Sequence, residues 1–153
     1  MGAGPFAIMP IDLDACDIGA LRHAAASEGI AFIERLVRDW EDASNRFEGA
    51  GEVLLGARVA TGVVAVGGLN HDPYQSDPYV GRLRHLYVMP RWRRRGVGRA
   101  MVARLLHAAR GQFHTVRLRT GTATPPEFYL ACDFLPCGAP DTTHEISIGE
   151  GGV

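Results

Sequence analysis

Lysine is absent from this chain of 153 residues, and all 16 of its Lys-plus-Arg positions are arginine. A P-loop needs a lysine that reaches the nucleotide phosphates, and a pyridoxal enzyme needs one for its Schiff base. The sequence therefore excludes both kinds of site. Arginine can replace lysine on most protein surfaces, so the absence by itself favours no other function.

Cysteine and long apolar runs are also scarce. The three cysteines, Cys16, Cys132 and Cys137, are odd in number and lack the C-x-x-C spacing, so we expect neither a disulfide scaffold nor a metal site. No apolar run approaches the roughly 20 residues that cross a bilayer, and the first residues do not resemble a secretory leader. These features predict a protein of the reducing cytoplasm.

Acidic residues are missing from one long stretch. The formal net charge is −1, but residues 1–80 carry five Arg against twelve acidic residues. Residues 81–153 carry eleven Arg against five acidic residues, and no Asp or Glu lies between Arg82 and Arg119. A functional interpretation must explain this arginine-rich segment.

Hydrophobic periodicity and turn residues predict a single α/β (α+β) domain over residues 1–153. The apolar runs at 53–59 and 63–69 predict an antiparallel hairpin. A strand at 82–89, a helix from near Gly98 to about Arg110 and a strand at 116–120 require a parallel crossover. The other expected elements are strands at 6–9 and 144–148, a helix from Asp14 or Asp17 to about residue 26, a helix over 30–47 and a short helix after Pro125 and Pro126.

A basic turn with two glycines separates the strand at 82–89 from the following helix. Gly96 and Gly98 let the backbone turn, and the amides of the first helical turn lie at the positive end of the helix dipole. Such a turn suits a phosphate or pyrophosphate. Four charged side chains surround it, namely Arg93, Arg94, Arg95 and Arg99.

Other interpretations of this turn are weaker. A dinucleotide-binding G-x-G-x-x-G fingerprint needs a third glycine, where the chain has Met101. A nucleic-acid surface would use the arginines, but the pI is about 6.6 and no common nucleic-acid-binding motif is present. A merely solvated loop would leave two glycines at a strand-to-helix junction unexplained.

The string V-x-P-x-W-R-R-R-G-V-G-R-A, from Val88 to Ala100, resembles motif A of the Gcn5-related N-acetyltransferase (GNAT) superfamily. The core pattern of that motif, R/Q-x-x-G-x-G/A, corresponds to Arg93, Gly96 and Gly98. The order of the expected elements fits the family over nearly the whole chain. The resemblance implies a mixed, splayed central β-sheet flanked by helices, and an enzyme with acetyl-CoA as its co-substrate.

The resemblance also implies how acetyl-CoA would bind. Backbone amides from about Arg94 to Arg99 would hold the pyrophosphate, and the Leu86–Val88 backbone would pair with the pantetheine arm as an added strand. The amide of Val88 would stabilise the oxyanion. The cofactor-binding residues implied are Leu86, Tyr87, Val88, Arg93, Arg94, Arg95, Gly96, Val97, Gly98 and Arg99.

A tyrosine in the helix after the next strand is a second element of the family. Here Tyr129 lies in the string from Phe128 to Phe134, with Asp133 where glycine is usual. By resemblance Tyr129 would protonate the departing coenzyme A thiolate. The alternative is that Tyr129 only packs in an aromatic cluster.

The reaction implied is direct attack of a primary amine on the thioester, so a group must accept the proton of the amine. Many family members have a glutamate on the motif A strand, where this chain has Arg82. The sequence leaves four candidates for the general base open: His85, His71, Asp72 and Asp77.

The acceptor stays open as well: a small-molecule or peptide amine. Acidic and aromatic side chains of the first two helices and the 70–80 loop would attract a cationic amine, whereas Arg82 and Arg84 could bind a substrate carboxylate. We expect no nucleic acid and no membrane as partners; a homodimer and an acyl group longer than acetyl stay open. The alternative functions are a coenzyme A-binding regulatory module without turnover and, with less support, an arginine-rich nucleic-acid-binding module.

Overall fold

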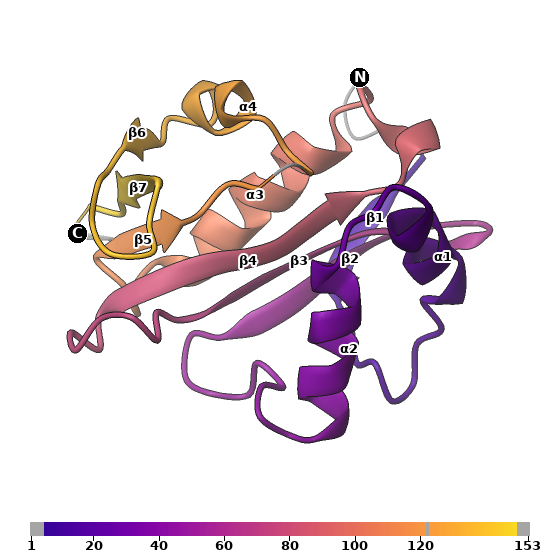
Figure 1. The fold of residues 1–153 in the computed structure, drawn as a ribbon, viewed down its shortest axis with the longest axis horizontal. Helices are drawn as coiled ribbons and strands as arrows, with labels where there is room; N and C mark the ends of the chain where they lie inside the picture. The colour runs from indigo at the N-terminus through magenta and orange to yellow at the C-terminus, as the bar shows by residue number, and fades with distance from the viewer. Residues whose placement is uncertain (1–4, 122, 150–153) are drawn as a thin grey trace.

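The computed structural model describes residues 5–121 and 123–149, which form a seven-stranded mixed sheet flanked by helices (Figure 1). The mixed α+β fold predicted from the sequence is confirmed. No helix in this part of the chain is long and apolar enough to cross a membrane. The strands are β1 (Ala7–Pro10), β2 (Val53–Val59), β3 (Gly62–His71), β4 (Val80–Val88), β5 (Thr115–Leu118), β6 (Leu135–Pro136) and β7 (His144–Ser147). The helices are α1 (Gly19–Ser27), α2 (Phe32–Glu41), α3 (Val97–Ala109) and α4 (Pro126–Ala131), and a 3-10 turn at Pro90–Trp92 follows β4.

The sheet is splayed in its middle. Its order is β1-β2-β3-β4-β5-β7-β6, and only β4 and β5 among these neighbours run parallel. They pair at three positions, from Val80 opposite Thr115 to Arg82 opposite Arg117, and then diverge (Figure 1). The β4 backbone from 83 to 88 therefore has no strand partner on its β5 side.

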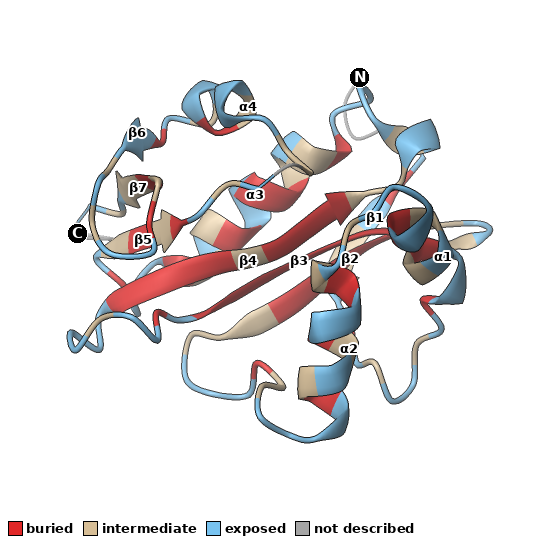
Figure 2. Ribbon diagram, viewed as in Figure 1, coloured by how far each residue is buried: buried red, intermediate tan, exposed pale blue. Residues whose placement is uncertain are grey.

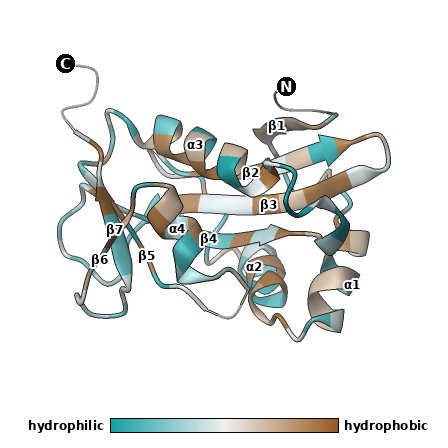
Figure 3. Ribbon diagram, turned by 90° about the horizontal axis from the view of Figure 1, so that it is seen from above, coloured by the Kyte–Doolittle hydropathy of each residue, from teal (hydrophilic) through white to brown (hydrophobic). Residues whose placement is uncertain are grey.

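Helices cover both faces of the sheet: α3 lies on one face, and α1 and α2 lie on the other (Figure 3). On the first face Met101 and Leu105 of α3 pack in one core with Leu86. On the second face Ile33 of α2 belongs to a core with Tyr87. Strand β4 supplies both cores and is buried over most of its length (Figure 2). Packing from two sides thus fixes the strand that carries motif A.

The helix predicted over 30–47 ends at Glu41 in the structure. Asp42 Oδ1 accepts a hydrogen bond from the backbone amide of Ser44 at 2.8 Å, a local turn that competes with helical pairing. Phe47 continues the apolar periodicity because it is buried and lies against Gly68. The pattern predicted which residues are buried, but it overestimated the length of the helix.

A β-bulge interrupts β4. The register with β3 shifts between Val66, which is opposite Tyr87, and Gly68, which is opposite Arg84. Within the bulge His85 adopts a φ of +61°, a left-handed conformation that histidine seldom takes. Bulges change the direction of side chains, and this one lies where β4 has separated from β5.

Candidate active site

Six consecutive backbone amides lack a protein acceptor in the turn between β4 and α3. The amides from Arg94 to Arg99 donate to no backbone or side-chain acceptor in the described part of the chain, and no side chain caps α3. The next amide, that of Ala100, donates to Gly96 O at 3.0 Å. Free amides at the start of a 13-residue helix form a binding site for an anion.

The two glycines of this turn are needed for different reasons. Gly96 has a φ of +83°, which other residues adopt only with strain. A Cβ on Gly98 would lie 3.3 Å from the ring of Phe128, so Gly98 allows α4 to approach the turn. The sequence predicted the first requirement, whereas the second comes from a tertiary contact.

Arg93 differs from the other arginines of the turn. Its guanidinium forms a bidentate ion pair with Glu28, which follows α1, at 2.6 and 2.9 Å, and its Nε donates to Val88 O at 2.9 Å. The Tyr87 hydroxyl donates to the same carboxylate at 2.6 Å. These hydrogen bonds, from Arg93 first and then from Tyr87, lower the pKa of Glu28. Arg93 is thus paired within the protein, while Arg94, Arg95 and Arg99 are exposed beside the turn.

The backbone N–H and C=O groups of the predicted cofactor-binding residues on β4 face alternately β3 and the unpaired edge. The amide of Met89 donates to Val64 O, so the backbone groups of Tyr87 also face β3, and those of Leu86 and Val88 face the unpaired edge. The Val88 carbonyl accepts the hydrogen bond from Arg93. The free groups at this edge are therefore those of Leu86 and the amide of Val88.

A cavity of about 570 Å³ lies in the splay of the sheet. Residues 82–86 of β4 form one wall, residues that end or follow β5 form another, and the segment from Gly29 to Phe32 between α1 and α2 closes one side. The charged residues of the lining are Arg35, Arg82, Arg84, Arg119 and Asp141. A volume of this size suits a small molecule.

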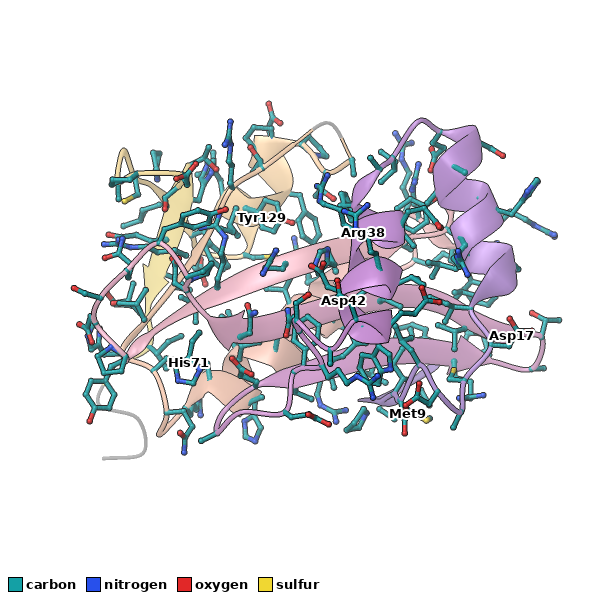
Figure 4. All side chains as sticks on the ribbon, turned by 60° about the horizontal axis from the view of Figure 1, so that its bottom comes forward. Met9, Asp17, Arg38, Asp42, His71 and Tyr129 are labelled. Carbon is teal, nitrogen blue, oxygen red and sulfur yellow. The ribbon has the colours of Figure 1, made fainter. Side chains whose placement is uncertain are left out.

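Tyr129 lines this cavity from α4 (Figure 4). It is buried, and its ring packs edge-on against Phe128 and Phe134. Burial raises the pKa of the hydroxyl to about 12, while a hydrogen bond with the Thr124 side chain acts in the opposite direction. The hydroxyl is therefore protonated at neutral pH. Tyr129 belongs to an aromatic cluster and also borders the cavity.

His85 is turned into the cavity wall at the bulge. Its buried ring lies near Phe32 and Phe47, with centroid distances of 6.0 and 6.3 Å. Neither ring nitrogen has a hydrogen-bond partner among the residues that the structure describes. Burial, followed by the charges of Arg84 and Arg35, lowers the pKa of His85 to about 3, while the backbone of Phe32 acts in the opposite direction. The ring is thus neutral at physiological pH.

The other three candidates for the general base lie outside the cavity lining. Each has a partner of opposite charge or a hydrogen-bond partner, and Figure 4 shows His71 well apart from Tyr129. The pairs are His71 with Glu52 at 3.0 Å, Asp72 with Arg82 at 3.6 Å and Asp77 with His114 at 2.9 Å. The structure therefore brings His85 alone, of the four candidates, to the cavity.

Two residues of the site were not predicted from the sequence. Arg35 of α2 reaches the cavity although it is far from motif A in the sequence, and Glu28 pairs with Arg93 across 65 positions. Both depend on how α1 and α2 pack on the sheet, and no local motif marks either of them. The apolar face of α2 indicated only which side of the helix is buried.

A splayed mixed sheet, an anion-binding turn after β4 and a cavity in the splay together define an acetyltransferase of the GNAT fold. The family model described as "Acetyltransferase (GNAT) family" matches residues 20–134. The chain belongs to this family, and the predicted resemblance is confirmed. No curated protein matches the chain in a sequence comparison.

Solved structures from several bacteria and an archaeon share the fold. A protein of Exiguobacterium sp. 255-15 that is classed as an acetyltransferase is 27% identical, with a TM-score of 0.83 over 93% of each chain. Ard1 from Thermoplasma volcanium is 22% identical, with a TM-score of 0.65 over 94% of this chain and 97% of its own. The yncA protein of Salmonella typhimurium, solved with its cofactor acetyl-CoA, is 15% identical, with a TM-score of 0.69 over 97% of each chain.

Proposed function

We propose that this protein is an acetyl-CoA-dependent N-acetyltransferase that transfers an acetyl group to a primary amine by direct attack on the thioester. The observation that carries the proposal is the run of free amides from Arg94 to Arg99 beside a cavity at the unpaired edge of β4. Membership of the GNAT family and the acetyl-CoA in the yncA structure support the same co-substrate here. We also propose a reducing, cytoplasmic setting, which the three free cysteines support.

The residues present fit the coenzyme. The free amides match the acceptor oxygens of a pyrophosphate, and the exposed arginines beside them supply positive charge. The edge at Leu86 and Val88 offers backbone groups to the pantetheine arm, in the manner of an added strand. Acetyl-CoA supplies the activated thioester, and the amide of Val88 stabilises the negative charge that develops on the carbonyl oxygen.

Two side chains that line the cavity act as proton donor and proton acceptor in this proposal. Tyr129, whose hydroxyl is protonated at neutral pH, donates a proton to the departing thiolate. His85 is the only one of the four candidate bases that lines the cavity, and we assign it the proton of the attacking amine; with a pKa of about 3 its imidazole is a weak base until a bound acceptor offsets the charges around it. No covalent enzyme intermediate is required, so the cysteines have no nucleophilic role.

Calorimetry with acetyl-CoA and a thiol-release assay with a panel of primary amines test this function. We expect saturable binding of acetyl-CoA and thiol release that depends on an amine. Binding without thiol release for any amine would support the coenzyme A-binding regulatory module instead. Salt-dependent binding to DNA or RNA that acetyl-CoA leaves unchanged would favour the nucleic-acid-binding module, and failure to bind acetyl-CoA would overturn the proposal.

A further inference from the structure

We propose that the acceptor amine carries an oxyanion group, a carboxylate or a phosphonate, which Arg84 and Arg35 bind. This inference rests on the proposed function and names the class of its second substrate as a small amino acid or a similar compound. The cavity wall contains four guanidinium groups and one carboxylate. Such a wall repels a polycationic amine and attracts an anion.

Two of the four guanidinium groups are compensated within the protein. Arg82 donates to Asp141 O at 2.7 Å, lies 3.6 Å from the buried carboxylate of Asp72, and stacks over Tyr74 with its Cζ 4.7 Å from the ring centroid. Arg119 lies 3.5 Å from the carboxylate of Asp141. These contacts fix that part of the wall and offset its charge.

Arg84 and Arg35 are not compensated in this way. Among residues 5–121 and 123–149, neither side chain forms an ion pair with a carboxylate. Arg84 is partly buried, and burial followed by the charge of Arg82 lowers its pKa, while Tyr74 and Asp39 act in the opposite direction. A partly desolvated guanidinium without a counter-ion is costly, and a bound oxyanion would remove that cost.

The positions of the two arginines suit a common ligand. Arg35, Arg84 and His85 all line the same cavity, and the charge of Arg35 acts on the pKa of the other two, although on Arg84 its effect is smaller than that of Asp39. The planar guanidinium donates two parallel hydrogen bonds to a carboxylate, which gives orientation as well as affinity. Arg84 precedes Leu86 by two residues on β4, so an acceptor anchored at Arg84 lies next to the stretch of unpaired edge that we assign to the pantetheine arm.

Binding of an oxyanion also favours the proton transfer assigned to His85. After burial, the charges of Arg84 and Arg35 are the next causes of its low pKa. A carboxylate between these arginines offsets both charges, and the imidazole then accepts a proton more readily. An acceptor that lacks the oxyanion does not offset these charges. The preference for acceptors with an oxyanion therefore extends from binding to the chemical step.

Matched amines that differ only in the oxyanion test the inference. We would compare amino acids with their primary amides and with aminophosphonate analogues in the thiol-release assay. We expect kcat/KM at least about 10-fold higher for the charged members. In R84M, kcat/KM for amino acids should fall by about 30-fold, mainly through KM, whereas kcat/KM for the amides should not fall and should rise if loss of the Arg84 charge makes His85 more basic.

Two control variants separate the position of the arginine from its charge. R38M removes an exposed arginine of α2 that does not line the cavity and should leave selectivity unchanged. R84K keeps the charge without the planar fork and should recover part of the lost kcat/KM. Unchanged affinity for acetyl-CoA in each variant shows that the protein is folded.

Several outcomes separate this inference from the proposed function. Equal kcat/KM for the charged and neutral members, or selectivity that survives in R84M, would overturn the inference while leaving acetyl transfer intact. Calorimetry with amino acids and aminophosphonates alone measures the Arg84 site without turnover. Binding that R84M abolishes would support the site even if no thiol were released, and a preference for one of the two series would identify the oxyanion.

Discussion

The turn after β4 and the cavity in the splay are both rich in arginine, but they present different hydrogen-bond donors. In the turn the donors are backbone amides, and Arg94, Arg95 and Arg99 are exposed around them. In the cavity the donors are guanidinium groups, those of Arg82 and Arg84 on the buried strand β4 and the exposed ones of Arg35 on α2 and Arg119 just after β5. In our proposals one region therefore binds through the path of its backbone, and the other through particular side chains.

This difference shows that an arginine-rich segment of a sequence is not one electrostatic surface. The glycines control the turn, because they set the direction of the amides. In the cavity, we propose that the arginines themselves select the acceptor. Changes in the turn should alter affinity for the coenzyme, and changes in the cavity should alter turnover or the choice of acceptor.

The largest effect is expected in the turn, from G98V. The new side chain would meet the ring of Phe128, which lies 3.3 Å from a Cβ at this position, and would displace the free amides. We expect affinity for acetyl-CoA to fall by at least about 100-fold in calorimetry. G138V is the control, because a Cβ there meets nothing within 4 Å. Affinity within threefold of the wild type in G98V would refute the phosphate site.

A smaller effect, confined to turnover, is expected in the cavity from Y129F. The change keeps the ring that packs on Phe128 and Phe134 but removes the hydroxyl. We expect kcat to fall by about 100-fold while affinity for acetyl-CoA is unchanged. Steady-state kinetics and calorimetry on the same preparation measure both, with Y79F, at an exposed tyrosine, as the control. An unchanged kcat would make Tyr129 a packing residue only.

The smallest effect is expected from E28Q, which loosens the ion pair that anchors Arg93. Both side chains are about a third exposed, so the loss of stability should be below about 1 kcal/mol. Because the pKa of Glu28 is lowered in the folded protein, its contribution is present above the unfolded pKa near 4.5 and is lost as the pH falls through the lower folded value. Denaturant melts at pH 7 and near pH 3 measure this.

E34Q is the matched control for E28Q. Glu34 accepts a bidentate pair from Arg22 at 2.6 and 2.9 Å, a similar geometry that does not involve the turn. Both variants should lose similar stability, but only E28Q should weaken acetyl-CoA binding, by a few-fold. Equal effects on that affinity would show that Glu28 has no positioning role.

The turn could be predicted from the sequence, whereas the cavity could only be predicted in part. The turn is local: Pro90, Gly96 and Gly98 occur at fixed spacing after an apolar strand. Arg82 and Arg84 share a face of β4 by simple alternation, which is why a carboxylate site was one expectation. The sequence contains no local signal for the bulge that adds His85 to this face, or for the packing that brings Arg35 to it.

Short elements also could not be predicted. Strand β6 has two residues, and the 3-10 turn at Pro90–Trp92 has three, too few for any hydrophobic period. The helix α2 ends where the side chain of Asp42 accepts a hydrogen bond from the amide of Ser44, and Phe47 is buried beyond this turn without being helical. Local polar bonds thus decided a boundary that the apolar pattern did not show.

The three-position ladder between β4 and β5 has a mechanical consequence. Strands β1 to β4 form one part of the sheet, here called the first leaf, and β5, β7 and β6 form the second leaf. The ladder joins the two leaves at one end of the splay. The cavity touches both leaves, through residues 82–86 on one and residues 118–121 on the other. A ligand held there would bridge the leaves along the length that lacks hydrogen bonds. The core beneath α3 already joins the two leaves on one face, so a bound ligand would add a second connection across the opening.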